Sequence, residues 1–562
     1  LPRAHRPALP HQHRDPAGSR PAGAELLAVG LEPSRPLELT GDDLTVDAVE
    51  EVARSRRRVT IAEAALHRVV RAREVVEQVL ASGAPVYGTT TGLGALARNP
   101  IPLEELERFS FATVADQTGS YGRPLPVPVV RAMMLSRANG MAKAGVGVRR
   151  ELIELLIALL NARVHPVVRD IGSVGQGDLA QMADIGKVLI GGGLADYRGA
   201  VMPGHQALSL AGLEPIRLAP KEALALVSAN GLTTGFGSMV LADVADLVDA
   251  LQVSAALSLE GFAGNLSIVH PAAGELRPHA GEKAAGRRLR ELLEGSYLWQ
   301  PGAARHLQDP LSFRCVPQTH GALYDALGHV RRTMEIELNS AGDNPLVAVE
   351  DQAILSVGNF DVVALAASFD FLRIAITAAV QVLDERVQKL LWAQFSGLST
   401  GLAATSGATG GLRQLGRACA ALTAEARGLA NPVSLDYRGQ VSEGVEDHAS
   451  MAPLSVRRTS ELVTLAYRII AFELVVAAQA VDLREGARPL GQGTRAAYEA
   501  VRDAVPVLVD ETDWAPDIDR LVATAAGAEL LRRVARDAGE RKPLSELHGP
   551  ALEHGDGSGE QP

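Results

Sequence analysis

The spacing of apolar residues along the chain predicts a protein built from long helices. A first helix is expected through Val46, Val49 and Val52, with its start capped by the Thr40 to Asp42 segment. Alternating strand patterns are scarce, so we expect an all-α fold in which long helices pack as nearly parallel rods. The other main runs with helical periodicity are residues 61–80, 149–161, 221–257, 319–338, 362–392, 412–430 and 455–487.

The chain ends and one apolar segment need separate interpretation. Residues 362–383 are long and apolar enough to cross a membrane. Asp370 and Arg373 lie inside this segment, and because two charges would be costly in lipid, we expect a buried bundle helix and no membrane segment. The Pro-, Arg- and His-rich start lacks a signal-peptide core. We therefore expect a disordered leader at 1–36, one helical domain at 37–545 and a polar tail at 546–562.

Composition narrows the class of protein further. Hydrophobic residues make up 47% of the 562 residues and aromatic residues only 4%, as in cores of packed aliphatic helices. A formal charge of −11 argues against a nucleic acid partner. Two cysteines, Cys315 and Cys419, provide no disulfide framework, and we expect a cytoplasmic protein. The histidines show no metal-ligand spacing, so no metal site is predicted.

Two glycine-rich loops are the first candidates for chemistry. The loop 87–94 combines three glycines with three threonines, a mixture that no regular element favours. The loop 172–177 leads into Asp178, which is expected to cap a helix by accepting hydrogen bonds from its first turn. A helix N-terminus under a glycine-rich loop favours negative charge, but this loop lacks the Lys-Ser/Thr pair of a nucleotide-binding P-loop.

Several motifs that follow one another along most of the chain suggest a family. They are VYGTTTGLG (86–94), RAN (137–139), GSVGQGDL (172–179), KEALAL (221–226), LQDPLSFRCVPQTHG (307–321), ELNSAGDNPL (337–346), SVGNF (356–360) and EDHASM (446–451). In this order they resemble the histidine and aromatic amino acid ammonia-lyase family, which includes aminomutases. The resemblance implies a fumarase/aspartase-like helical bundle, a homotetramer whose active sites are shared between subunits, and a small amino-acid-like substrate.

The family's prosthetic group is the main point of departure. In the family an Ala-Ser-Gly triad cyclises to methylidene-imidazolone (MIO), the electrophile that activates the amine. At that place this chain has only Gln176 and Gly177, one residue fewer and without the serine. Closure at Ser173 would be crowded by the β-branched Val174. The literal triad at 81–83 falls at an expected helix end and is interpreted as a helix stop, so we predict that MIO is absent and that no other cofactor is present.

Other site residues follow from the resemblance. Tyr87 matches the catalytic base, and the alternative is a structural hydroxyl. Arg314 matches the residue that binds the substrate carboxylate, and the alternative is an ion pair with Asp309. Glu446 matches an acid near the substrate amine, and the alternative is a carboxylate that stabilises a helix N-terminus. The matches to polar and aromatic pocket residues are Gln308, Asn344 and Phe360.

Other departures accompany the shortened loop. Ser228 replaces the asparagine that supports the electrophile, and Leu311 replaces a tyrosine. Thr90 replaces the asparagine of the Tyr87 loop, and Asp361 stands where the family commonly has histidine. The positions that select the substrate side chain fall near Asp116 and Gln117. A carboxylate there favours a polar substrate over a phenyl ring, unless Asp116 only caps a turn.

Three functions remain open from the sequence. The first is a carbon–nitrogen lyase that acts on a polar amino-acid-like substrate without MIO. The second is a catalytically silent homologue that serves as a partner or regulatory subunit. The third is a conventional MIO-dependent lyase or aminomutase with an unusual triad.

Overall fold

The computed structural model describes residues 35–404, 410–436, 440–484, 486, 488–510, 514, 516–526 and 529–539. All of them belong to one compact unit, Arg35–Pro562. The first strand, β1, begins at Leu37, where the helical domain was expected to begin. The predicted polar tail at 546–562 and all but the last two residues of the predicted leader at 1–36 lie outside the described residues.

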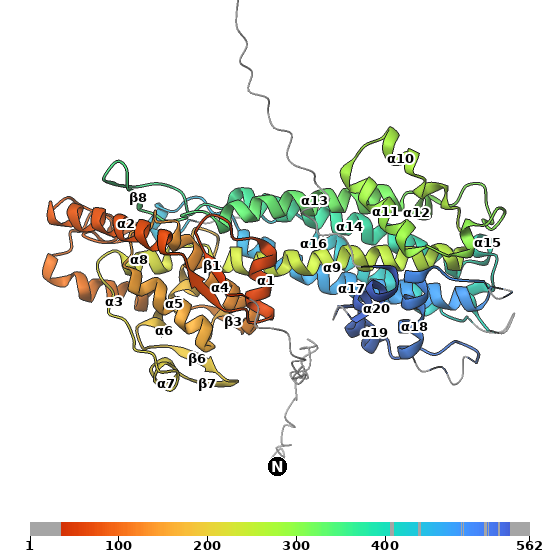
Figure 1. The fold of residues 1–562 in the computed structure, drawn as a ribbon, viewed down its shortest axis with the longest axis horizontal. Coiled ribbons are helices and arrows are strands. Elements are labelled where there is room, and N and C mark those ends of the chain that lie inside the picture. The colour runs from red at the N-terminus through yellow and green to blue at the C-terminus, as the bar shows by residue number, and fades with distance from the viewer. Residues whose placement is uncertain are drawn as a thin grey trace, which may run out of the picture. The chain divides into compact units, whose positions relative to one another are not determined.

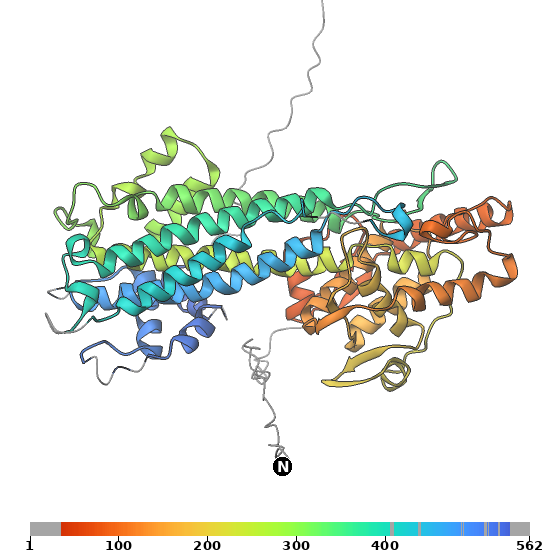
Figure 2. The ribbon, with the colours of Figure 1, turned by 180° about the vertical axis from the view of Figure 1, so that it is seen from behind.

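Long helices that run side by side form the centre of the unit (Figures 1 and 2). They are α9 (Gly231–Phe262), α13 (Val316–Leu338), α14 (Val363–Leu391), α16 (Arg413–Leu429) and α17 (Ala452–Asp482). Helix α17 packs against both α9 and α14, and α13 packs against α14. Their facing surfaces are buried Leu, Val, Ile and Ala side chains, which belong to one continuous core. The all-α prediction is confirmed.

Helix α14 contains the segment considered as a membrane span. It is long and apolar enough for one, but 61% of its most apolar window is buried inside the unit. Asp370 and Arg373 pair with each other in the core. The guanidinium of Arg373 also donates to the Ser455 carbonyl at 2.8 Å. Both charges therefore have partners within the bundle, as expected of a core helix.

Shorter elements gather at the two ends of the long helices (Figure 1). One end carries α1 (Val46–Arg54), α2 (Glu63–Ala81), α3 (Leu106–Gln117), α4 (Val127–Ala142), α5 (Arg150–Ala162), α6 (Leu179–Leu189), α7 (Gly204–Leu210) and α8 (Glu222–Val227). The other end carries α10 (Pro271–Leu276), α11 (Ala280–Leu292), α12 (Leu311–Arg314), α15 (Ala393–Ser396), α18 (Gln492–Ala504), α19 (Ile518–Ala526) and α20 (Glu529–Ala538).

Short strands supplement the helices. Parallel β1 (Leu37–Leu39) pairs with β2 (Val59–Ile61), and β3 (Tyr121–Pro124) pairs antiparallel with β5 (Arg169–Ile171). The three-stranded sheet orders β4 (Val164–Pro166), β6 (Leu194–Tyr197) and β7 (Ala200–Pro203). A hairpin joins β8 (Leu346–Ala348) to β9 (Ala353–Leu355). Strands this short show too few alternations to be visible in the sequence pattern.

Two local predictions are wrong. Residues 221–257 were expected to form one helix, but the chain breaks between α8 and α9. At the break the Ala229 carbonyl accepts from Asp178 N at 2.7 Å, and Asn230 Nδ2 donates to the Phe360 carbonyl at 2.8 Å. These tertiary hydrogen bonds replace helical ones. The first helix is capped by Thr45, which accepts from Ala48 N, and not by Thr40 to Asp42.

Candidate active site

The Tyr87 loop folds back so that its own backbone reaches the tyrosine hydroxyl. Gly94 N donates a hydrogen bond to Tyr87 Oη at 2.9 Å. Thr90, which replaces the family's asparagine, accepts from Val86 N at 2.7 Å and so closes the turn. Gly88 has a φ of +62°, and a Cβ there would collide with Leu224 of α8. The loop therefore requires glycine at this position, both for its backbone conformation and for its close packing.

A short hairpin brings Glu446 to this loop. Val441 and Glu446 form an antiparallel bridge, and Ser442 Oγ accepts from Ala95 N at 3.2 Å. A Cβ on Gly94 would lie 3.9 Å from Glu446 Oε1. Because Gly94 also bonds Tyr87, the predicted base and the predicted acid approach the same residue. Burial raises the pKa of the Glu446 carboxyl above its usual value.

The shortened loop is docked on the segment after Glu446. Met451 N donates to the Val174 carbonyl at 2.9 Å, and Ser450 Oγ donates to the Gly175 carbonyl at 2.9 Å. Gln176 Nε2 donates to the main-chain carbonyl of His448. The Cβ-free Gly177 lies against Ser228, since a Cβ there would be 3.8 Å from Ser228 Cα. Gln176, Gly177 and Ser228 are thus brought together.

The residues of this loop do not fit an MIO group. Gln176 and Gly177 occupy the place of the triad, and neither carries a hydroxyl that can leave. The hydroxyl of Ser173 holds the loop, because it accepts from Gly175 N at 3.0 Å and donates to the Gly177 carbonyl at 3.2 Å. The literal triad at 81–83 lies at the end of α2, where Ser82 is the C-cap and Gly83 has a φ of +73°. It is a helix stop, as predicted.

Asp178 does not cap the helix that follows the loop. Its side chain makes no capping hydrogen bond to α6. Instead Oδ2 accepts from Thr233 N of α9 at 2.8 Å. Burial raises the pKa of Asp178 to about 6, although the hydrogen bonds from Thr233 oppose this shift. The capping prediction is wrong because tertiary packing offers Asp178 the first turn of α9.

Asn344 and Phe360 stand on connections that meet near this loop. Asn344 Oδ1 accepts from Val357 N at 2.9 Å, which ties the two connections together. The Phe360 carbonyl accepts from Asn230, which follows Ser228 by two residues. Asp361 Oδ2 lies 2.8 Å from Nε2 of His448, whose carbonyl binds Gln176.

Sequence reasoning missed two titratable residues near Asp361. His448 lies within the EDHASM motif, and the carboxylate at Asp361 was a signal that a histidine could pair with it. Glu337 opens the ELNSAGDNPL motif, but nothing in that motif indicated that its carboxyl would be buried. Burial, together with the charge of Asp361, raises the pKa of Glu337 to about 7.

Gln308 and Arg314 lie far from the Tyr87 loop within this chain. Helix α12, which ends at Arg314, is at the end of the bundle opposite α2 and α3, between which the Tyr87 loop runs (Figures 1 and 2). Arg314 Nη1 donates to Gln308 Oε1 at 2.7 Å, whereas Asp309 accepts from Asn265 N at 2.6 Å. The guanidinium of Arg314 therefore hydrogen-bonds Gln308, and not Asp309, the ion-pair partner that the sequence suggested as the alternative.

The positions expected to select the substrate side chain lie at the end of α3. Asp116 is exposed and Gln117 is half-buried. Helix α3 packs on α6 and α8, the helices that follow the shortened loop and precede Ser228. Asp116 and Gln117 therefore belong to the same end of the bundle as Tyr87.

Comparisons with known proteins agree with this fold. The family profile described as aromatic amino acid lyase matches residues 44–503. A histidine ammonia-lyase of Stigmatella aurantiaca is 38% identical over 504 residues, which cover 89% of this chain and 98% of the relative. The crystal structure of ergothionase, an ergothioneine-degrading enzyme from Treponema denticola, superposes with a TM-score of 0.84 at 30% identity, covering 89% of this chain and 99% of that one. Tyrosine aminomutase from Streptomyces globisporus also gives 0.84 at 30% identity, covering 91% and 100%.

The fold and these relatives define a carbon–nitrogen lyase. The chain belongs to the aromatic amino acid lyase family, whose members include histidine ammonia-lyases.

Proposed function

We propose that this protein eliminates an amine from a polar amino-acid-like substrate without an MIO group. The observation that carries the proposal is the convergence of Tyr87, Glu446 and the shortened loop at Gln176. Tyr87 and Glu446 approach Gly94 from different segments. Gln176 and Gly177, which stand in place of the triad in the neighbouring loop, carry no hydroxyl that can leave.

The reaction needs one proton acceptor and a place for the amine. Tyr87, as phenolate, takes the proton from the substrate β-carbon, and those bonding electrons form the new carbon–carbon double bond. The Cα–N bond breaks, and an ammonium group departs as neutral amine. Gly94 N–H points at the phenol oxygen and stabilises negative charge there before the proton arrives. The Glu446 carboxylate holds the ammonium group by charge pairing.

Two residues of this chain and two of its relatives support the proposal that the substrate side chain is polar. Asp116 and Gln117 at the end of α3 offer a carboxylate and an amide, which would be costly to bury against a phenyl ring. The relatives named histidine ammonia-lyase and the ergothioneine-degrading enzyme act on polar compounds. We extend this preference to the present chain.

A second copy of the chain completes the site in this proposal. Arg314, a planar two-pronged donor suited to a carboxylate, lies at the opposite end of the bundle from Tyr87. An antiparallel neighbour would bring its α12 to the Tyr87 loop. We therefore propose a homotetramer with shared active sites.

Intact mass and ammonia release test the two parts of the proposal. The purified chain is expected to have the mass that its sequence encodes, whereas MIO formation would remove two waters. Ammonia or amine release is then measured over a panel of polar and aromatic amino acids and their N-methylated forms. Turnover of a polar member by a protein of unreduced mass is the expected result. A deficit of two waters, or turnover of aromatic members alone, contradicts it.

A silent homologue is the second candidate, and the missing serine at Gln176 and Gly177 favours it. Such a protein would keep the fold and bind a relative. No release over the whole panel, together with co-purification of an active lyase of the same family, would favour this function instead.

A further inference from the structure

The connection at 339–345, between α13 and β8, carries Asn344 into the candidate site and is held by charged and polar side chains that no role yet explains. We infer that Asn139 and Lys221 are positioning residues that fix this connection and thereby set the place of the Asn344 amide. Asn139 comes from the RAN motif at 137–139, and Lys221 comes from KEALAL at 221–226. The inference rests on the proposed function.

An amide clamp holds the start of the connection. Asn139 Nδ2, fully buried on α4, donates to the Leu338 carbonyl at 2.9 Å and to Asn339 Oδ1 at 3.0 Å. Asn139 Oδ1 accepts from Gly41 N at 3.0 Å. Asn339 Oδ1 also accepts from Leu44 N at 2.8 Å, so two asparagines join the N-terminal segment to the end of α13.

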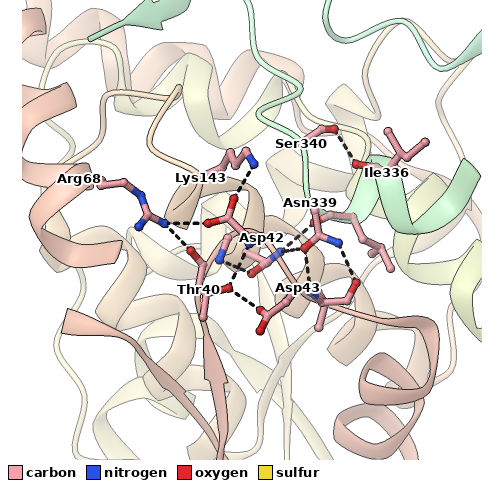
Figure 3. A network of polar contacts seen from close by, with 12 residues as sticks. Thr40, Asp42, Asp43, Arg68, Lys143, Ile336, Asn339 and Ser340 are labelled. Carbon is pink, nitrogen blue, oxygen red and sulfur yellow. Dashed lines mark hydrogen bonds and ion pairs between the residues drawn. The ribbon is translucent and has the colours of Figure 1, made fainter. Parts of the chain in front are cut away.

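Figure 3 shows the outer part of this clamp. Asp42 accepts from Lys143 Nζ at 2.5 Å and from Arg68 Nη2 at 3.3 Å. Ser340 Oγ donates to the Ile336 carbonyl at 2.6 Å and closes the last turn of α13. Hydrogen bonds and ion pairs thus hold the segment that begins at Thr40 against the end of α4 and the end of α13.

A buried ion pair holds the other end of the connection. Lys221 Nζ lies 2.9 Å from Asp343 Oδ2, and both side chains are fully buried. Lys221 also donates to the Val146 carbonyl at 2.7 Å. Its backbone has a φ of +76°, an unusual conformation for lysine that local sequence alone does not favour. Tertiary contacts therefore hold Lys221 in place, and Asp343 is the residue directly before Asn344.

Arg137 adds a second buried cation to this end. Its guanidinium donates to the Ala225 carbonyl of α8, and it is near enough to Asp343 for that carboxylate to favour the charged form. Burial nevertheless lowers the pKa of both Arg137 and Lys221. The pairing of Lys221 with Asp343 makes the position of this carboxylate hard to change, since moving it would leave buried charge unpaired.

The backbone approaches so closely that small residues are required. A Cβ on Gly140 would lie 3.3 Å from the Ser340 carbonyl oxygen, and one on Gly145 would lie 2.7 Å from Ala341 Cβ. Val347 N donates to the Gly145 carbonyl at 2.8 Å just after the connection. The connection therefore lies directly against the end of α4 and the turn that follows it.

These contacts bear on chemistry through Asn344. Its Oδ1 accepts from Val357 N, so the place of Asn344 also sets the connection that leads to Phe360 and Asp361. A shift of about 1 Å in a site group can cost about 10²-fold in rate. If Asn139 and Lys221 served stability alone, their loss would lower the free energy of unfolding but would leave the position of Asn344 in the folded protein unchanged.

Matched pairs of variants separate the two roles. Lys221→Met breaks the buried pair with Asp343, and Arg288→Met breaks the buried pair with Asp249 (2.8 Å), near the opposite end of the bundle. Asn139→Ala removes the amide clamp, and Asn161→Ala removes a similar clamp on Val59, which accepts and donates at 2.8 and 3.0 Å. Thermal unfolding shows which variants fold. Hydrogen exchange is followed in peptides containing the amides of Val347 and Val357.

We expect exchange at these two amides to speed up at least about tenfold in Lys221→Met and Asn139→Ala and to be unchanged in the two controls. On a substrate that the wild type turns over, kcat is expected to fall by about 10²-fold with KM within a few-fold. Faster exchange spread evenly over the chain, or unchanged kcat with a mobile connection, overturns the inference. If Lys221→Met does not fold, Asn139→Ala decides.

Failure of the proposed function can be told apart from failure of this positioning role. A wild type that releases no amine from any member of the panel contradicts that function, while the exchange measurements still show whether the connection depends on Lys221 and Asn139. Unchanged exchange in both variants would then reject the positioning role on its own.

Discussion

The hydroxyl oxygen of Tyr87 accepts a hydrogen bond from the main-chain N–H of Gly94 at 2.9 Å. This contact closes the eight-residue loop 87–94 on itself, and Ser442 fixes the neighbouring peptide by accepting from Ala95 N. The donor to Tyr87 is therefore a backbone group held from two sides, and the phenol oxygen is an acceptor in the resting structure. That arrangement suits a group that must carry negative charge.

Removing the hydroxyl tests the base directly. Tyr87→Phe is expected to lower kcat/KM by about 10²- to 10⁴-fold, the usual range for loss of a general base, with little change in the melting temperature. Amine release on the substrate found in the panel is the measurement. Tyr121→Phe, on a tyrosine that is 76% exposed, is the control. An active Tyr87→Phe variant would end the assignment.

The charge of Glu446 is expected to matter at the acidic end of the pH profile. Because burial raises its pKa, the carboxylate becomes protonated above its ordinary range, and amine binding should weaken there as pH falls. Glu446→Gln is expected to remove this acidic limb and to raise KM at neutral pH. An unchanged pH profile of kcat/KM would show that Glu446 does not pair with the substrate.

Shared active sites predict complementation between two inactive variants. Tyr87→Phe and Arg314→Ala are each expected to lose activity, because each removes one part of every site. Co-expressed chains should form mixed assemblies in which some sites combine an intact Tyr87 with an intact Arg314. Recovery of amine release in the mixture is the expected result. Active Arg314→Ala protein, or no recovery in mixed assemblies shown to form, contradicts sharing.

The buried pair in α14 makes a prediction about stability. Arg373→Met leaves Asp370 buried without its cation and removes donors to the Leu429 and Ser455 carbonyls. The expected loss is about 3–5 kcal/mol in the free energy of unfolding, measured by denaturant titration. Arg458→Met, at a partly exposed pair with Glu461, should change stability little. Equal losses in the free energy of unfolding for the two substitutions would show that the buried pair stabilises the fold no more than an exposed one.

Glu337 should make the folded state sensitive to pH. Its pKa rises from 4.5 to about 7 on folding, so the folded state holds its proton more tightly than the unfolded state. Its contribution to stability is therefore complete below about pH 4.5 and is lost as pH rises through about 7. Glu337→Gln is expected to flatten this part of the dependence of melting temperature on pH. Parallel curves for variant and wild type would contradict the shift.

Much of the bundle follows from local patterns. The apolar periodicity places α13, α14, α16 and α17 to within a few residues, because each presents a long apolar face to its neighbours. The same patterning misplaces the first cap and misses the break between α8 and α9. At Ala229 and Asn230 the decisive hydrogen bonds come from Asp178 and go to Phe360, which are far away in sequence.

The sequence by itself determined the family, the all-helical class and the shortened loop at Gln176 and Gly177, since these depend on residue identity and order. Only the tertiary structure decided which residues meet. It brings Tyr87 and Glu446 to Gly94, pairs Asp361 with His448, and leaves Arg314 at the other end of the bundle. The physical reason is that helix periodicity specifies which face is buried, whereas loop contacts between distant segments depend on how the helices pack.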